Sequence, residues 1–325
     1  MSLSNQLKVS VVIPAYNSSQ RIHIPLERLI LQNVDDESFE IIVIDNASTD
    51  GTGEIATNYW KTNASSRNIS FRVVREEKKG LVHARIRGVI ESRFPIVCFL
   101  DDDNVPENND YIIAGISEFT DESIGLLTSR IFPDFQSKIT ASIQKREHLL
   151  AINNKLGDKR IEWEPCASLC PSIGAGMWLR REVFLSAFPW KNPQALLTDR
   201  IGNSLVSGGD IEIGYFIGKA GFKRVYSPSL RLKHIIPDSR LNTSYFCRLI
   251  NGVVRSTLTL ELKYNHQKFG FLYKVGVLTE LLAVLVFAPV IIFLSSPDGV
   301  REFLFVISAR WAKVQGSYFN EQPDG

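Results

Sequence analysis

The stretch Ile96-Val97-Cys98-Phe99-Leu100-Asp101-Asp102-Asp103-Asn104 decides the fold, because five apolar residues run directly into three consecutive carboxylates. A continuous apolar run of this length is typical of a strand that is buried on both faces, as in a parallel sheet. In such sheets ligands bind beyond the carboxyl ends of the strands, which is where these aspartates fall. An Asp triplet on its own is also compatible with a solvated acidic turn, so its meaning depends on the surrounding chain.

Three adjacent carboxylates repel one another, and such a site is costly unless water or a cation compensates the charge. Oxygen ligands of this kind suit Mg²⁺ or Mn²⁺, ions that usually hold substrate phosphates as well. The chain has no Gly-x-Gly-x-x-Gly after its first apolar run and no phosphate-binding loop with Gly-Lys-Ser/Thr. A phosphate ligand would therefore need a metal ion for neutralisation, and the aspartates offer a place for one.

Outside this stretch, apolar runs alternate with amphipathic segments, which is the pattern of a doubly wound α/β layer. Asn17 and Asp45 follow the first two apolar runs, so they should share one edge of the sheet with the aspartates. The predicted strands are Val9–Ile13, Ile41–Ile44, Phe71–Val74 and Ile96–Leu100, and the predicted helices run through residues 24–31, 55–59, 80–90 and 210–220.

The composition is that of a globular protein: 325 residues, 44% hydrophobic and 22% charged. The net charge of +2 excludes a strong field for nucleic acid over the whole chain. The four cysteines show neither a disulfide framework nor a paired zinc spacing. The short polar segment Met1–Lys8 is no secretory signal, so we expect a cytoplasmic protein.

Seven short motifs occur in the order that they have in a known family. They are Val12-Ile13-Pro14-Ala15-Tyr16-Asn17, Ile44-Asp45-Asn46-Ala47-Ser48-Thr49-Asp50-Gly51, Gly80-Leu81-Val82-His83-Ala84-Arg85, Leu100-Asp101-Asp102-Asp103, Gly174-Ala175-Gly176-Met177, Gly208-Gly209-Asp210 and Lys233-His234. With them the chain resembles the inverting glycosyltransferases of family 2, above all members that build bacterial extracellular polysaccharide. The resemblance implies a GT-A (Rossmann-like) α/β fold with a doubly wound mixed sheet in residues 1–240.

The resemblance also implies roles for individual residues. Asp103 and His234 would bind Mn²⁺ or Mg²⁺, and Asp210 would be the catalytic base. Many relatives carry Glu where this chain has Gly209, which leaves any acceptor contact of that Glu without a counterpart. The nucleotide sugar, expected to be UDP-linked, would contact Pro14, Ala15, Tyr16, Asn17, Asp45, Asn46, Ser48, Gly80, Arg85, Asp101, Asp102 and Gly176. Apart from the resemblance, Lys79 and Arg200 can reach the diphosphate, or they can equally be solvated surface charges.

Three features have two interpretations each on residue patterns alone. Asp210 precedes a helical apolar pattern, so it can cap that helix, act as a base, or do both. Residues 191–207 can form a lid over the donor or an ordinary surface loop. Trp178 can offer its ring to a sugar or pack in the core.

The composition changes after about Leu241, where basic residues recur and Leu281–Leu294 contains no charge. That uncharged run is short for a membrane span. We predict a helical C-terminal extension over residues 241–325, which suits peripheral contact with anionic lipid at the inner face of the membrane. A soluble packing domain and a dimer interface are the alternatives.

These observations favour a metal-dependent inverting glycosyltransferase that moves a sugar from a nucleotide sugar to a saccharide or lipid-linked saccharide acceptor. A sugar nucleotidyltransferase is a second hypothesis, although the chain lacks an N-terminal Gly-rich basic loop. A carbohydrate-binding module without activity is a third.

Overall fold

The computed structural model describes residues 7–193, 196, 205–265, 270–294 and 296–319. The chain forms two compact units. The sheet unit comprises residues 1–134, 151–196 and 209–235, and the helical unit comprises residues 135–150, 197–208 and 236–325. The chain therefore passes between the units more than once, and the division at residue 240 stays a prediction.

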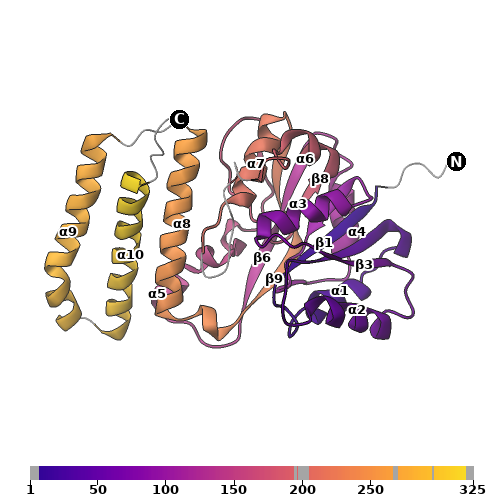
Figure 1. Ribbon diagram of the computed structural model, residues 1–325, viewed down its shortest axis with the longest axis horizontal. Helices are drawn as coiled ribbons and strands as arrows, with labels where there is room; N and C mark the ends of the chain where they lie inside the picture. The colour runs from indigo at the N-terminus through magenta and orange to yellow at the C-terminus, as the bar shows by residue number, and fades with distance from the viewer. Residues whose placement is uncertain (1–6, 194–195, 197–204, 266–269, 295, 320–325) are drawn as a thin grey trace. The chain divides into compact units, whose positions relative to one another are not determined.

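The sheet unit is built on a nine-stranded mixed sheet with the order β3-β2-β1-β4-β8-β6-β9-β5 and with β7 beside β9. Its four parallel strands, β1 to β4, are those predicted from the apolar runs. The other strands extend the sheet through antiparallel pairs, which join β8 to β4, β6 to β8, and both β5 and β7 to β9 (Figure 1). The strands are β1 Val9–Ala15, β2 Phe39–Asp45, β3 Ser70–Arg75, β4 Ile96–Phe99, β5 Asn104–Pro106, β6 Ile124–Phe135, β7 Ile161–Trp163, β8 Met177–Arg180 and β9 Lys223–Ile236.

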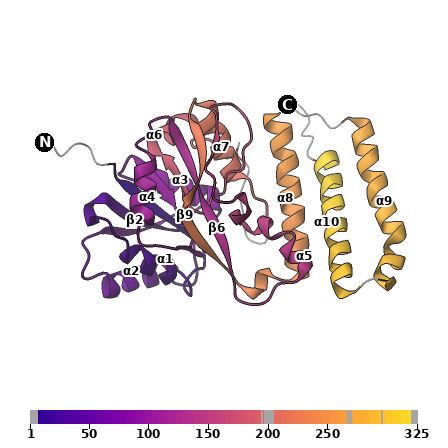
Figure 2. The same cartoon turned by 180° about the vertical axis from the view of Figure 1, so that it is seen from behind.

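Two layers of helices cover the sheet because successive side chains of a buried strand point to opposite faces. Val11 and Ile13 of β1 pack in one core with helices α1, α2 and α4. Val12 packs in the other core with helices α3, α6 and α7 (Figures 1 and 2). These helices are α1 His23–Ile30, α2 Thr52–Asn63, α3 Leu81–Glu91, α4 Tyr111–Glu118, α6 Arg181–Ala187 and α7 Gly209–Lys219. This arrangement confirms the predicted α/β class.

Glu40 of β2 is a fully buried carboxylate that joins three segments of the sheet unit. Its oxygens accept hydrogen bonds from the Ser10 hydroxyl (2.6 Å), the Arg93 backbone N–H (2.8 Å) and the Arg72 guanidinium (2.5 Å). Glu40 lies near the amino end of β2, at the opposite end of the strand from Asp45.

We expect Glu40→Ala to lower the free energy of unfolding by about 3 kcal/mol, because it leaves a hydroxyl and a guanidinium without their shared acceptor. Urea unfolding followed by circular dichroism measures this change. Glu77→Ala is the matched control, since Glu77 pairs with Arg75 at the surface and should leave the midpoint unchanged. A Glu40→Ala midpoint equal to that of the control would contradict the assigned role.

The helical unit contains α5 Ala141–Gln144, α8 Thr243–Tyr264, α9 Phe271–Leu294 and α10 Pro297–Phe319. Helix α10 packs against both α8 and α9, and lies between them (Figure 1). Arg146 anchors the start of α10 through two hydrogen bonds to Glu302, at 2.9 and 2.7 Å. These helices confirm the predicted C-terminal helical extension. The described residues also form 3₁₀ helices: η1 Asp36–Ser38 and η3 Asn154–Leu156 in the sheet unit, and η2 Glu147–Leu150 and η5 Asp238–Arg240 in the helical unit.

None of the helices in the described parts of the chain combines the length and the apolar character needed to cross a membrane.

Candidate active site

The loops after β1 and β2 hold each other at the carboxyl edge of the sheet. The Asn17 backbone N–H donates to Ser48 Oγ (3.0 Å), and Asn17 Oδ1 accepts from the Thr49 backbone N–H (2.9 Å). Asn17 adopts a φ of 48°, a left-handed conformation that asparagine tolerates better than most residues. The preceding Pro14 and Ala15 are buried, whereas Tyr16 and Asn17 are exposed. Tyr16 and Asn17 are therefore the two residues of this predicted group whose side chains a ligand can reach.

Asp45, the last residue of β2, and Asn46, which follows it, fix the next two loops. Asp45 accepts a hydrogen bond from the Ser48 N–H (3.0 Å) and forms an ion pair with Arg75 (3.3 Å). The Asn46 side chain donates to the Lys78 carbonyl (2.6 Å) and accepts from the Gly80 N–H (2.8 Å). These bonds set the turn that precedes α3.

The same turn presents a cation beside an aromatic ring. Lys79 Nζ lies 5.6 Å from the centroid of the Tyr16 ring. Both side chains are exposed. Gly80, at φ 131°, makes the turn possible because a Cβ is strained there. The loops after β1 and β3 thus place an aromatic face and an ammonium group at one position on the rim.

Asp102 is buried and contacts the loop after β1. Its carboxylate accepts hydrogen bonds from Ser18 Oγ and from Arg21 (2.9 Å). Burial, together with the carboxylates of Asp103 and Asp101, raises the pKa of Asp102 to about 7, although Arg21 opposes the shift. Asp102 therefore links the end of β4 to the loop after β1.

A second carboxylate, which lies in one of the sequence motifs but received no predicted role, supports the same loop. Asp50 accepts hydrogen bonds from the Ser19 N–H (3.0 Å) and from the Thr52 hydroxyl (2.5 Å). Burial acts against ionisation, but these hydrogen bonds lower the pKa of Asp50 to about 2. A signal was present in the sequence, since Asp followed two residues later by Thr at a helix start is a common capping pattern.

Asp103 and His234 lie side by side, although 131 positions separate them in the chain. Strand β5 pairs with β9 in a register that sets Asn104 opposite His234, and the Ile235 N–H donates to the Asp103 carbonyl (2.9 Å). His234 Nε2 is 3.4 Å from Asp103 Oδ2, and the two side chains are 7% and 11% exposed. The pairing of these strands thus brings together the two predicted metal ligands.

Asp101 connects to Asp210 through Arg85 and Gly174. The buried Arg85 guanidinium lies 3.9 Å from Asp101 Oδ1 and 5.7 Å from the centroid of the Phe99 ring. A Cβ at Gly174 would lie 1.9 Å from Arg85 Nη2. The Gly174 N–H donates to Asp210 Oδ2 (3.0 Å), while Asp210 Oδ1 accepts from the Ile211 N–H (2.9 Å). A continuous set of contacts therefore runs from the triplet to the predicted base.

Asp210 lies in the first turn of α7, which begins at Gly209. The prediction that it stands at or near the start of a helix is confirmed. The positive end of the helix dipole stabilises a negative charge at this position.

We expect Gly174→Ala to lower the activity of this candidate site at least about tenfold, because the new methyl group displaces Arg85 from its place beside Asp101. Steady-state kinetics measures the loss. Gly276→Ala is the control, since nothing lies within 4 Å of a Cβ built there. Unchanged kinetics for Gly174→Ala would show that the position of Arg85 has no bearing on the reaction.

Three further features from the sequence remain, and the structure describes two of them. Trp178 is fully buried, donates its Nε1–H to the Tyr111 hydroxyl (3.1 Å) and fills the space over Gly115, so it packs in the core and offers no face to a sugar. Gly176 has a φ of 63° and accepts from the Ser129 hydroxyl (2.7 Å). Arg200 lies outside the described residues, as do residues 194–195 and 197–204 of the segment that can form a lid or a surface loop.

The described residues contain no group of three or more His, Cys, Asp or Glu side chains arranged to hold a metal ion. Asp103 and His234, a group of two, stay the predicted metal ligands.

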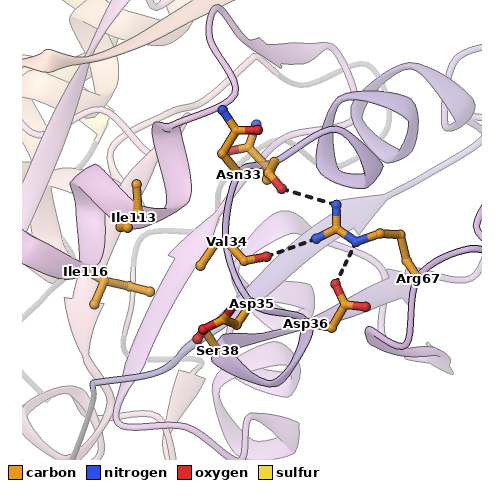
Figure 3. A pocket seen from close by; sticks show the side chains of 9 residues that line it. Asn33, Val34, Asp35, Asp36, Ser38, Arg67, Ile113 and Ile116 are labelled. Carbon is orange, nitrogen blue, oxygen red and sulfur yellow. Dashed lines mark hydrogen bonds and ion pairs between the residues drawn. The ribbon is translucent and has the colours of Figure 1, made fainter.

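A cavity of about 650 Å³ lies elsewhere in the sheet unit, at the loop between α1 and β2. Arg67 holds this loop by hydrogen bonds to Asp36 Oδ1 (2.6 Å) and the Val34 carbonyl (3.1 Å), and Ile113 and Ile116 of α4 face it (Figure 3). None of the predicted site residues lines this cavity, so the cavity contributes nothing to the candidate active site.

The family model for glycosyl transferase family 2 matches residues 10–185. The match covers more than half of the chain, and the protein belongs to glycosyl transferase family 2. It is 25% identical over 219 residues to glycosyltransferase AglE of Haloferax volcanii, and the aligned region covers 67% of this chain and 64% of that protein. It is 29% identical over 157 residues to the uncharacterized glycosyltransferase YfnE of Bacillus subtilis, which covers 47% of this chain and 38% of that protein. The chain thus spans less than two thirds of the length of these relatives.

Among solved structures, the chain resembles the mannosyltransferase PcManGT from Pyrobaculum calidifontis in complex with GDP-Man and Mn²⁺. The TM-score is 0.62 at 16% identity, and the alignment covers 98% of this chain and 89% of that one. This likeness confirms the predicted GT-A fold.

Proposed function

We propose that the protein is an inverting, metal-dependent glycosyltransferase that moves a sugar from a nucleoside diphosphate sugar to a hydroxyl group of a saccharide or lipid-linked saccharide in polysaccharide biosynthesis. The observation that supports this proposal most is the pair Asp103 and His234, 3.4 Å apart. It adjoins the set of contacts that leads through Arg85 and Gly174 to Asp210.

The donor set fits a divalent cation. Mg²⁺ and Mn²⁺ are usually held by one or two protein ligands, with substrate phosphates and water in the remaining positions. An imidazole nitrogen beside a carboxylate favours Mn²⁺ over Mg²⁺. PcManGT, which has the same fold, was solved with GDP-Man and Mn²⁺. When bound, the cation would neutralise the charge that develops on the departing diphosphate.

The residues of the chain would perform the remaining steps. Tyr16 and Lys79 would contact the nucleotide on the rim, with Asp45 toward the ribose or base. Asp210, oriented by the Gly174 and Ile211 N–H groups, would accept the proton of the acceptor hydroxyl as the new bond forms. Direct attack from the face opposite the leaving group inverts the anomeric carbon.

A thermal-shift screen of nucleotide sugars with Mn²⁺ would identify the sugar donor. A ligand that binds only the native state, at about 100 times its Kd, stabilises that state by about 2.7 kcal/mol. We expect a UDP-sugar to raise the melting temperature, only when Mn²⁺ is present, and GDP-sugars are the comparison. A screen in which no nucleotide sugar raises the melting temperature would contradict the proposal.

Two reaction assays then separate the remaining hypotheses. A glycosyltransferase hydrolyses its donor slowly without acceptor, whereas a carbohydrate-binding module releases no nucleotide. A sugar nucleotidyltransferase would release pyrophosphate from a nucleoside triphosphate, which we do not expect here. A lipid-linked acceptor would place the reaction at the inner face of a membrane.

A further inference from the structure

Helix α9 is apolar around nearly its whole circumference, and the contacts recorded for its described side chains are with α10. Among the described residues, fourteen large hydrophobic side chains are exposed, and six of them lie on α9. Leu281–Leu294 contains no charged residue. A helix that is apolar all round is normally covered on every side, by protein or by lipid.

The buried side of α9 is narrow. Val277 and Leu281 form a small cluster with Val314 of α10, and Glu280 pairs with Arg310 of the same helix. Within the helical unit, α9 lies on the far side of α10 from α8 in both views (Figures 1 and 2). The contact with α10 therefore covers one side of the helix, and the exposed side chains of α9 lie on other sides.

The exposed side is a continuous stripe, which we call the outer face of α9. At about 100° per residue its members fall within an arc of about 100°. Leu282, Leu285 and Val286 are 52%, 46% and 72% exposed, which is high for branched apolar side chains. The outer face consists of Val275, Leu278, Leu282, Leu285 and Val286.

The size of the outer face argues against a second copy of the chain as its cover. A helix of 24 residues is about 36 Å long. A strip about 10 Å wide along it would bury about 360 Å² on each partner, less than half of the roughly 800 Å² per partner of a stable interface. A lipid surface has no such minimum, because each apolar side chain that enters it contributes separately.

The charge of the surrounding helices fits an anionic surface. Helices α8, α9 and α10 carry seven Lys and Arg against four Asp and Glu, a net charge of +3. The uncharged run of 14 residues in α9 would span only about 21 Å, short of the roughly 30 Å of a hydrocarbon core. A helix that lies along the membrane surface agrees both with the positive net charge and with the short length of the uncharged run.

We propose that the outer face of α9 binds an anionic lipid bilayer, with the helix lying in the plane of the interface. This binding is separate from the donor chemistry of the proposed function and does not depend on it. It would hold the chain at the surface where a lipid-linked acceptor resides.

The test is sedimentation of the full chain with vesicles of phosphatidylcholine mixed with phosphatidylglycerol, and with vesicles of phosphatidylcholine alone. We expect the protein to sediment with the anionic vesicles and much less with the neutral ones. The double variant Leu282→Glu, Val286→Glu should reduce this binding at least about tenfold, since it places two carboxylates in the interface. Ile113→Glu on α4, where Ile113 is 48% exposed, is the matched control and should bind like the unaltered protein.

Donor hydrolysis and circular dichroism are measured on the double variant as well, to check that it stays folded. Equal sedimentation of the double variant and the control would overturn the proposal. The unaltered protein could also bind neither kind of vesicle and form dimers that are lost in the double variant. That result would show that a second copy covers the outer face instead.

Discussion

Asp103→Ala should abolish Mn²⁺-linked donor binding and lower turnover of the nucleotide sugar by at least about a thousandfold, because the variant retains only His234 of the two proposed ligands. Isothermal calorimetry and steady-state kinetics measure the two losses. His234→Ala should cause a smaller loss of the same kind, since Asp103 supplies the charge and His234 does not.

Without Mn²⁺, the Asp103→Ala variant should be no less stable than the unaltered protein. Asp103 is one of the carboxylates that raise the pKa of Asp102 to about 7, so its removal relieves a repulsion between buried charges. Asp35→Ala, an exposed carboxylate in the loop between α1 and β2, is the control and should leave binding and turnover unchanged. Full activity of Asp103→Ala in the presence of Mn²⁺ would refute the assigned role.

Asp210→Asn should lower kcat by about a hundredfold to ten-thousandfold while the affinity for the donor stays the same. The amide oxygen can still accept the Gly174 N–H, so the local geometry is kept, but the side chain no longer takes a proton. The split between an unchanged donor Kd and a reduced kcat distinguishes a base from a residue that merely shapes the site.

Asp298→Asn is the matched control for Asp210→Asn, because Asp298 also lies in the first turn of a helix, α10. It should leave kcat unchanged. An Asp210→Asn variant with normal kcat, or with a large loss of donor affinity instead, would contradict the role of Asp210 as base.

The parallel half of the sheet was predictable because its strands are buried on both faces. Their apolar runs, such as Val9–Ile13 and Ile96–Leu100, are visible without any partner. The antiparallel strands carry no such signal. Strand β9, Lys223–Ile236, includes four basic residues, and its identity as a strand depends on pairing with segments far away in the chain.

The distance between Asp103 and His234 follows from that same pairing. Residue patterns alone place Asp103 at a sheet edge but give no position for His234, which entered only through the resemblance to the family. Likewise, nothing local to Gly174 indicates that it borders Arg85, because the contact arises where two helices and a loop meet around the sheet.

The structure also shows how polar residues at a predicted site are divided between holding loops and facing a ligand. Asn46 uses its amide to fix the turn before α3, and Asp102 is buried against Ser18 and Arg21. Sequence motifs mark all of these residues alike, since both kinds lie at strand ends. Donor contacts of Asn46 and Asp102 stay a prediction.

Calorimetric titration of the full chain with a nucleoside diphosphate, in saturating Mn²⁺ and again in EDTA, tests most directly whether a cation held by Asp103 and His234 binds the diphosphate. We predict that Mn²⁺ raises the nucleotide affinity at least about tenfold and that the nucleotide raises the Mn²⁺ affinity by the same factor, as linkage requires. Both effects should vanish in Asp103→Ala. Equal nucleotide affinity with Mn²⁺ and with EDTA would contradict the account.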